Sequence, residues 1–166
     1  MKRYVFLLSL ISAFTLFQTP ETSVPIKDLR DAPATVVVSN RSLQLSSYAW
    51  RDFAPSSSNT NGNPLMVTVK LTSADKEALP NGVRMERVWV LFGEQVWEVS
   101  NLRGAGHDRD KDRWINCSNI PECQATVREG PQWGPEVFVD VVVRLKDSEG
   151  KEHLLRAPKQ KVIGTV

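Results

Sequence analysis

Apolar residues in this chain recur in short segments where polar and apolar positions alternate. No segment keeps a 3.6-residue apolar stripe long enough to indicate a long helix. The segments are rich in β-branched and aromatic residues and are separated by Gly, Pro, Asn and Ser, which is typical of antiparallel strands. We therefore predict strands at residues 35–39, 42–50, 65–72, 87–92, 95–100, 123–128, 136–146 and 153–157.

This pattern predicts an all-β fold. About seven or eight short strands separated by turns are similar to the immunoglobulin-like or fibronectin-like antiparallel β-sandwich, in which two sheets pack face to face. The similarity concerns architecture alone, because the two cysteines are far closer in sequence than those that bridge the sheets of antibody domains. At most one short helix is expected, at residues 73–79, where Ser73 is a possible cap.

Residues 87–100 predict a β-hairpin whose register is set by its turn. Gly93 stands first in a two-residue loop, the position where a type II′ turn needs a positive φ. This turn places Phe92 opposite Gln95 and Val88 opposite Val99. One face is then an expected core surface: Val88, Val90, Phe92, Trp97 and Val99. The other face is too apolar for ordinary solvated surface, so that a loop or a partner must cover it: Arg87, Trp89, Leu91, Val96 and Glu98.

A second hairpin is predicted around residues 147–151. A type I turn followed by Gly150 in the left-handed conformation would close a three-residue loop. This register sets Lys146 opposite Glu152 and Asp147 opposite Lys151, which places unlike charges across the ladder. In the strand before the turn, every second residue is predicted to face the core: Val137, Val139, Val141, Val143 and Leu145.

The N-terminus has the features of an export signal. Lys2 and Arg3 precede an apolar run of about 13 residues, which is shorter than the roughly 20 that a membrane-spanning helix needs. We therefore expect a cleaved signal peptide over residues 1–23, an extended leader over 24–33 and a single β-sandwich domain over 34–166. The mature protein is expected to be periplasmic or secreted, without stable insertion in a membrane.

Charge and cysteine content narrow the partners. The net charge of +2 is spread along the chain, so nucleic acid is not an expected partner.

Cys117 and Cys123 are the only cysteines, and in an exported protein they are expected to form one local disulfide. A loop of this size adds about 2 kcal/mol by the chain-entropy argument, so the bridge fixes a loop rather than the whole fold.

Three carboxylates at alternate positions, Asp108, Asp110 and Asp112, form the one metal-like pattern. Calcium loops use this spacing, but the helix-loop-helix site also needs glycine sixth and glutamate twelfth. Arg113 and Asn119 occupy those positions. The segment is therefore interpreted mainly as a solvated, self-neutralising loop, and a calcium site of another kind is the alternative. No other cofactor is expected.

Five tryptophans give the chain its candidate binding residues. Aromatic side chains supply much of the energy at protein and sugar surfaces. Trp97 and Trp50 are assigned to the core. The candidate contact residues are Trp89, Leu91, Val96, Trp114 and Trp133. Two arrangements remain open for the Trp89 face: the loop of residues 101–122 folds over it, or it is an exposed binding patch.

Catalytic signatures are weak. His107 and His153 are the only imidazoles, and neither accompanies a nucleophile motif. His153, next to a turn, is expected to face solvent. The sequence therefore favours an exported, non-enzymatic binding or accessory module that acts through surface loops on another envelope or extracellular protein, or on a carbohydrate. The alternatives are a calcium-linked envelope protein that uses residues 108–112 and a small hydrolase.

Overall fold

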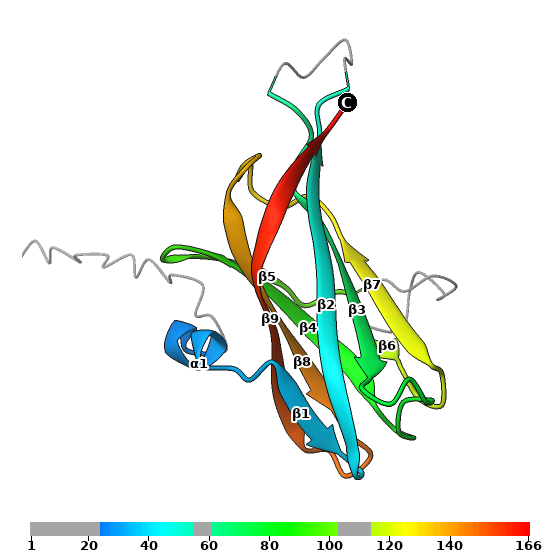
Figure 1. The fold of residues 1–166 in the computed structure, drawn as a ribbon. Helices are drawn as coiled ribbons and strands as arrows, with labels where there is room; N and C mark the ends of the chain where they lie inside the picture. The colour runs from blue at the N-terminus through cyan, green and yellow to red at the C-terminus, as the bar shows by residue number, and fades with distance from the viewer. Residues whose placement is uncertain (1–23, 55–60, 103–113) are drawn as a thin grey trace, which may run out of the picture.

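The structure, a computed structural model, describes residues 24–54, 61–102 and 114–166. These ranges contain one short helix and nine strands (Figure 1). The helix α1 covers Ile26–Arg30. The strands are β1 (Thr35–Val38), β2 (Arg41–Asp52), β3 (Met66–Ser73), β4 (Arg84–Phe92), β5 (Gln95–Val99), β6 (Ile115–Asn116), β7 (Glu122–Val127), β8 (Phe138–Lys146) and β9 (Glu152–Thr165).

The strands form one curled sheet of mixed direction, shaped as a half-barrel. Its order is β5-β4-β8-β9-β2-β3-β7, with β1 beside β2 and β6 beside β4. The all-β prediction is confirmed, but the separate-sheet arrangement of an immunoglobulin-like sandwich is not. The reason is β9, which pairs antiparallel with β8 through Lys161 and then runs parallel to β2 from Val162. This strand joins two halves that a sandwich would keep apart.

β9 continues to Thr165, beyond the predicted strand at residues 153–157, although Pro158 lacks the N–H that a strand interior needs. In the structure, Pro158 and Lys159 lie at an irregularity of the β8–β9 ladder, where the register shifts between Val139 and Val141. Lys159 adopts a φ of +54° there. The strand therefore accommodates the proline at a bulge and resumes pairing after it.

Both predicted hairpin registers are confirmed. β4 and β5 pair from Val88 with Val99 to Phe92 with Gln95, and Gly93 has a φ of +55°. In the second hairpin Lys146 lies opposite Glu152, and the N–H of Asp147 donates to the carbonyl of Lys151. Short turns fix the pairing of neighbouring strands, which is why local sequence was sufficient.

The main core fills the inner side of the curl. Its buried side chains come from both halves of the sheet, as the alternation of apolar residues predicts. The face of the first hairpin that was expected to be core lies here, with Phe92, Trp97 and Val99 half-buried at the margin. The central members include Leu43, Leu45, Val67, Val69, Leu71, Val88, Val90, Val141, Val143, Leu145 and Leu155.

The helix predicted at residues 73–79 is wrong. Ser73 is the last residue of β3, and bends and turns follow. The Asp75 carboxylate accepts hydrogen bonds from the Ser73 hydroxyl and the Glu77 N–H, and Lys76 has a φ of +63°. These local bonds satisfy the polar groups without a helix, as Asp and Ser side chains often do in turns.

The extended conformation expected for residues 24–33 is corrected at Ile26–Arg30, where α1 forms. The N–H groups of Asp28 and Leu29 both donate to the carbonyl of Pro25, which begins the helix. Five residues are too few for a helical periodicity to be visible in the sequence. The signal peptide and the domain boundary at residue 34 remain predictions.

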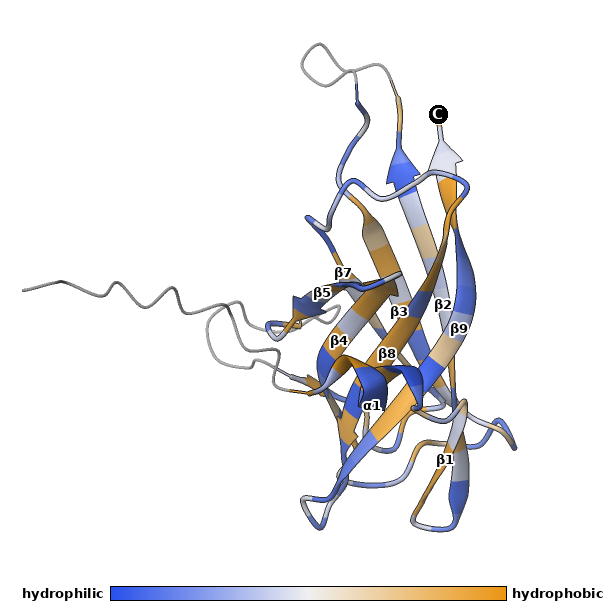
Figure 2. Cartoon of the chain, turned by 90° about the vertical axis from the view of Figure 1, so that its left-hand side faces the viewer, coloured by the Kyte–Doolittle hydropathy of each residue, from blue (hydrophilic) through white to orange (hydrophobic). Residues whose placement is uncertain are grey.

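α1 covers the second apolar face of the first hairpin. Its Leu29 and the following Ala32 are buried in a small cluster with Trp89, Leu91 and Val142, outside the main core. In Figure 2, α1 lies in front of apolar stretches of the sheet. Arg30 donates hydrogen bonds to the Gly93 carbonyl and the Glu94 carboxylate, at 2.5 and 2.7 Å, and so ties the helix to the β4–β5 turn.

Replacement of Leu29 by Ala is expected to lower the free energy of unfolding by about 2–5 kcal/mol, because it empties a fully buried site. Lys27→Ala, at an exposed position of the same helix, is the matched control and should change the stability by less than about 0.5 kcal/mol. Urea denaturation followed by tryptophan fluorescence measures both. Equal stability of the two variants would contradict the conclusion that α1 stabilises the fold by covering the cluster around Trp89.

Candidate binding surface

The structure buries two of the residues proposed for binding from the sequence. Trp89 and Leu91 lie beneath α1, where no partner reaches them, and Val96 is half-buried at the edge of the same cluster. The exposed-patch alternative is therefore wrong for Trp89 and Leu91. Among the described residues, the cover comes from α1 and not from the predicted 101–122 loop, of which residues 103–113 lie outside the description.

The other two tryptophan candidates are half-buried at different places. Trp114 lies under the guanidinium of Arg84, which is 5.2 Å from its ring centroid. Trp133 packs against Phe92, with 5.5 Å between the ring centroids, and borders the main core. The five candidate residues therefore do not form one surface.

The proposed calcium ligands Asp108, Asp110 and Asp112, as well as His107, lie outside the described residues. The calcium site therefore stays a prediction. Within residues 24–54, 61–102 and 114–166, no group of three or more His, Cys, Asp or Glu side chains is placed to hold a metal ion. In the same ranges, no helix has the length and apolar character needed to cross a membrane.

An aromatic surface lies instead on the outer side of the sheet, along β2. Tyr48 and Trp50 occupy alternate positions that point away from the core, since the residues between and beside them, Ala49 and Arg51, are buried. Their ring centroids are 5.3 Å apart and their planes are inclined by 31°. Trp50 was assigned to the core, and its half-exposed position on the outer face is a correction.

Apolar residues of β9 and β8 continue this surface. Ile163 lies directly opposite Trp50, because the last part of β9 runs beside β2 (Figure 1). Two residues earlier, Lys161 lies opposite Phe138 at the start of β8. Tyr48, Phe138 and Ile163 are 47%, 60% and 38% exposed. We call Tyr48, Trp50, Phe138 and Ile163 the aromatic face.

β3 and β7 form the other border of the aromatic face. Met66 lies opposite Trp50, and its sulfur accepts a hydrogen bond from the Arg128 guanidinium. Thr68 lies opposite Tyr48 and shares a hydrogen bond of 2.9 Å with Thr126. The border therefore combines a flexible thioether, a guanidinium and hydroxyl groups beside the aromatic rings.

The sequence contained a signal for this surface. In residues 43–51 the odd positions Leu43, Leu45 and Ala49 are apolar, which predicts that even positions face outward. Tyr48 and Trp50 both have even numbers. The proximity of Ile163 and Phe138 had no local signal, because it depends on the change of partner within β9.

A buried arginine anchors the loops at this end of the sheet. Arg51 is 3% exposed and is the one buried charged residue of β2. Its hydrogen bonds to described residues end on the main-chain carbonyls of Asn61, Asn63, Gln132 and Gly134. It therefore holds the β2–β3 loop and the β7–β8 connection together beside the aromatic face.

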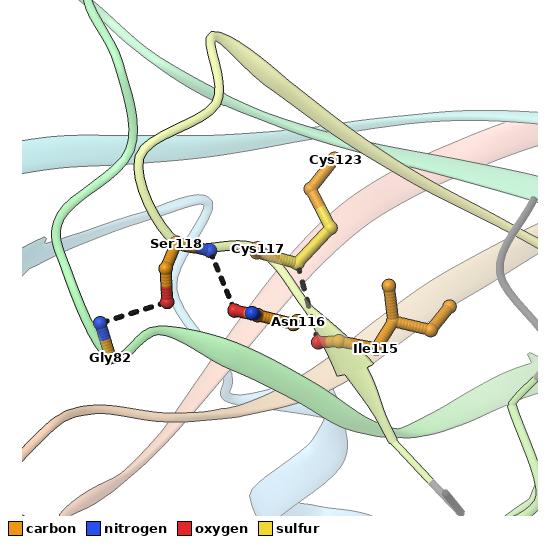
Figure 3. Close-up of a disulfide and its surroundings, with 6 residues drawn as sticks. All are labelled: Gly82, Ile115, Asn116, Cys117, Ser118 and Cys123. Atoms are coloured by element: carbon orange, nitrogen blue, oxygen red, sulfur yellow. Dashed lines mark hydrogen bonds between the residues drawn. A yellow bond between two sulfur atoms is a disulfide. The ribbon is translucent and has the colours of Figure 1, made fainter. Parts of the chain in front are cut away.

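The predicted disulfide is formed between Cys117 and Cys123, and both residues are buried (Figure 3). Cys117 follows β6, which pairs with β4, whereas Cys123 belongs to β7 at the end of the sheet. The bridge thus joins the two margins of the half-barrel. Nearby, the Cys117 N–H donates to the Val83 carbonyl and the Gly82 N–H donates to the Ser118 hydroxyl.

His153 does not face solvent, contrary to the expectation from its place beside a turn. Its ring Nε2 lies 2.8 Å from a carboxylate oxygen of Asp147, and both side chains are about nine-tenths buried. The other oxygen of Asp147 accepts the N–H groups of Glu149 and Lys151. The hydrogen bond with His153 lowers the pKa of Asp147, burial raises it less strongly, and the two backbone donors lower it further.

Comparisons with known proteins assign no family. No family model matches the chain, and no curated protein matches it. A crystal structure of the "Putative ApaA Protein from Bordetella pertussis" aligns with 78% of this chain and 97% of its own, at 13% identity and a TM-score of 0.41. A likeness this distant supports no statement about activity or partners.

Replacement of Arg51 by Met is expected to destabilise the protein by about 3 kcal/mol or more, because it removes the hydrogen bonds that the buried guanidinium donates, and a hydrogen bond from a charged group contributes about 1.5–3 kcal/mol. Arg41 lies on the same strand, and its ion pair with Asp75 is exposed. Arg41→Met should therefore lower the free energy of unfolding by less than about 1 kcal/mol. Urea denaturation measures both. Similar losses would contradict the anchoring role of Arg51.

The lowered pKa of Asp147 predicts acid sensitivity. Because its folded value lies below the ordinary value of 3.8, the carboxylate stabilises the fold above that pH and loses this contribution as the pH falls through the folded value. The stability gap between the wild type and Asp147→Asn should therefore shrink as the pH falls through the folded value of Asp147. Glu149→Gln, at an exposed position of the same turn, should show the pH dependence of stability of the wild type. A stability gap between the wild type and Asp147→Asn that persists in strong acid would refute the link between the Asp147 carboxylate and stability.

Proposed function

We propose that this chain is an exported, non-enzymatic binding module and that its contact surface is the aromatic face. The export part of the proposal rests on the basic residues and apolar run at the N-terminus. The binding part rests on one observation: exposed aromatic and aliphatic side chains from three strands gather on one side of the sheet. Exposed apolar side chains that gather on one side of a protein are typical of interaction sites.

The chemistry of the aromatic face favours a protein as the partner. Tyr, Trp, Phe, Met and Arg are the residue types enriched in the centres of protein interfaces, and all five occur here. Its lysines are paired with carboxylates: Lys161, which lies opposite Phe138 within the face, contacts Glu136 at 2.6 Å, and Lys70 on β3 contacts Glu122 at 3.0 Å. Charges that are paired beside apolar side chains are compatible with a protein interface.

The ring geometry argues against a sugar. The ring centroids of Tyr48 and Trp50 are 5.3 Å apart and their planes are tilted by 31°, so the two rings do not form one flat platform. Side chains of a protein partner can pack against two inclined rings, whereas a sugar ring stacks best on a flat aromatic surface.

A non-enzymatic function is supported by the state of His153. Its imidazole is bonded to Asp147 within the β8–β9 hairpin. The same carboxylate accepts the Lys151 N–H of the turn. The small-hydrolase alternative would require His107 or His153 to act on a substrate beside a nucleophile, and His107 lies outside the described residues. The arrangement fits a structural role.

The aromatic face can be tested by substitution. The folded chain is immobilised, proteins are captured from an envelope extract, and the captured protein is purified and titrated against variants. Tyr48→Ala and Ile163→Ala should each weaken binding about tenfold or more, as expected for central interface residues. Both side chains are exposed, so circular dichroism should show an unchanged fold.

Val37→Ala is the matched control, because Val37 is 65% exposed on β1 at the other end of the sheet. Its affinity should equal that of the wild type. Trp114→Ala tests the loop that the sequence favoured and should also have no effect. Equal affinity of all four variants would refute the proposed surface, and binding to a polysaccharide array without any captured protein would refute the protein partner.

A further inference from the structure

β7 is the last strand of the sheet. In the described part of the chain it has a strand neighbour on one side only, β3, with a continuous register from Glu122 opposite Thr72 to Val127 opposite Val67. An edge strand presents alternating N–H and C=O groups that can pair with another strand. This ladder has no bulge, and the strand contains neither proline nor lysine, which commonly protect such edges.

We propose that β7 pairs antiparallel with β7 of a second copy of this chain, with Ala125 opposite Ala125 across a two-fold axis. In this register Glu122 lies opposite Arg128, Gln124 opposite Thr126 and Cys123 opposite Val127. Both copies gain backbone hydrogen bonds, and the two half-barrels share one continuous sheet.

Charge complementarity selects this register. Glu122, which also contacts Lys70 of its own chain at 3.0 Å, and Arg128 are both exposed. The two-fold axis places each opposite its counterpart, which gives two unlike pairs for each dimer. A shift by two residues in either direction places Glu122 opposite Thr126 or Gly130 and loses both pairs. A shift by one residue would mix the two faces of the sheet, and buried Cys123 would oppose outward-facing Thr126.

The alternation of burial also fits. Cys123, Ala125 and Val127 point to the core side, so the pairing brings core-side residues opposite each other and outward residues opposite each other. The margin at β5 is less suitable, because the equivalent symmetric register would set Trp97 opposite itself, and Trp97 is in tight contact with Gly130. The dimer does not require the proposed binding partner, although it uses Glu122 and Arg128 at the border of the aromatic face and would place two aromatic faces on one side of a shared sheet.

Sedimentation equilibrium over a wide concentration range tests the proposal with charge reversals. Glu122→Arg and Arg128→Glu should each raise the dimer dissociation constant about tenfold or more, since two attractive pairs become repulsive. An equimolar mixture of the two variants should restore association, because each copy then meets the opposite charge in its partner. The combined substitution Glu122→Arg with Arg128→Glu in one chain should also restore it.

Matched controls reverse charges at the exposed hairpin tip, Glu149→Arg and Lys151→Glu, and should dimerise like the wild type. Circular dichroism verifies that all variants are folded. A wild-type chain that stays monomeric at every concentration overturns the proposal. It is also overturned by a dimer that both reversals leave unchanged, or by reversed variants that do not associate when mixed. None of these measurements uses the binding partner, so failure here is distinct from failure of the aromatic face.

Discussion

The change of partner within β9 is the interaction on which the rest of the structure depends. Its first part completes an antiparallel ladder with β8, and its last four residues form a parallel ladder with β2. Backbone hydrogen bonds therefore run without interruption from β5 to β7, and the sheet can curl around a single core. The same change brings Ile163 beside Trp50, so the aromatic face exists only because this strand crosses from one half to the other.

A second constraint comes from the outer side of β4 and β8. Trp89, Leu91 and Val142 form an apolar surface there that the curl cannot bury, because the main core lies on the inner side. The chain covers it with its own residues 24–32, through Leu29 and Ala32. Burial of this surface under residues 24–32 stabilises the fold and makes the surface inaccessible to a partner. The apolar surface that stays exposed lies on the adjoining part of the sheet, around β2 and the end of β9.

The half-barrel has two margins, and the covalent and packing contacts between them explain its shape. At one end the disulfide links the segment after β6 to β7, and at the other Gly130 packs directly against the ring of Trp97 on β5. A side chain at Gly130 would collide with that ring, so the connection after β7 can cross closely over β5 only with glycine there. These two contacts hold the margins in place. The edge of β7 that faces away from β3 has no strand neighbour among the described residues.

The sequence by itself determined what short-range chemistry controls. Alternation located eight of the nine strands of the described residues, Gly93 and Gly150 fixed the two hairpin registers, and the presence of only two cysteines left a single pairing within the chain. Tertiary structure alone decided what lies far apart along the chain: the parallel pairing of β9 with β2, the docking of α1 on Trp89 and the position of Trp50 on the outer face. The physical reason is that turns and alternation act between neighbouring residues, whereas a covered or exposed tryptophan depends on which distant segment gains most by burying its own apolar side chains there.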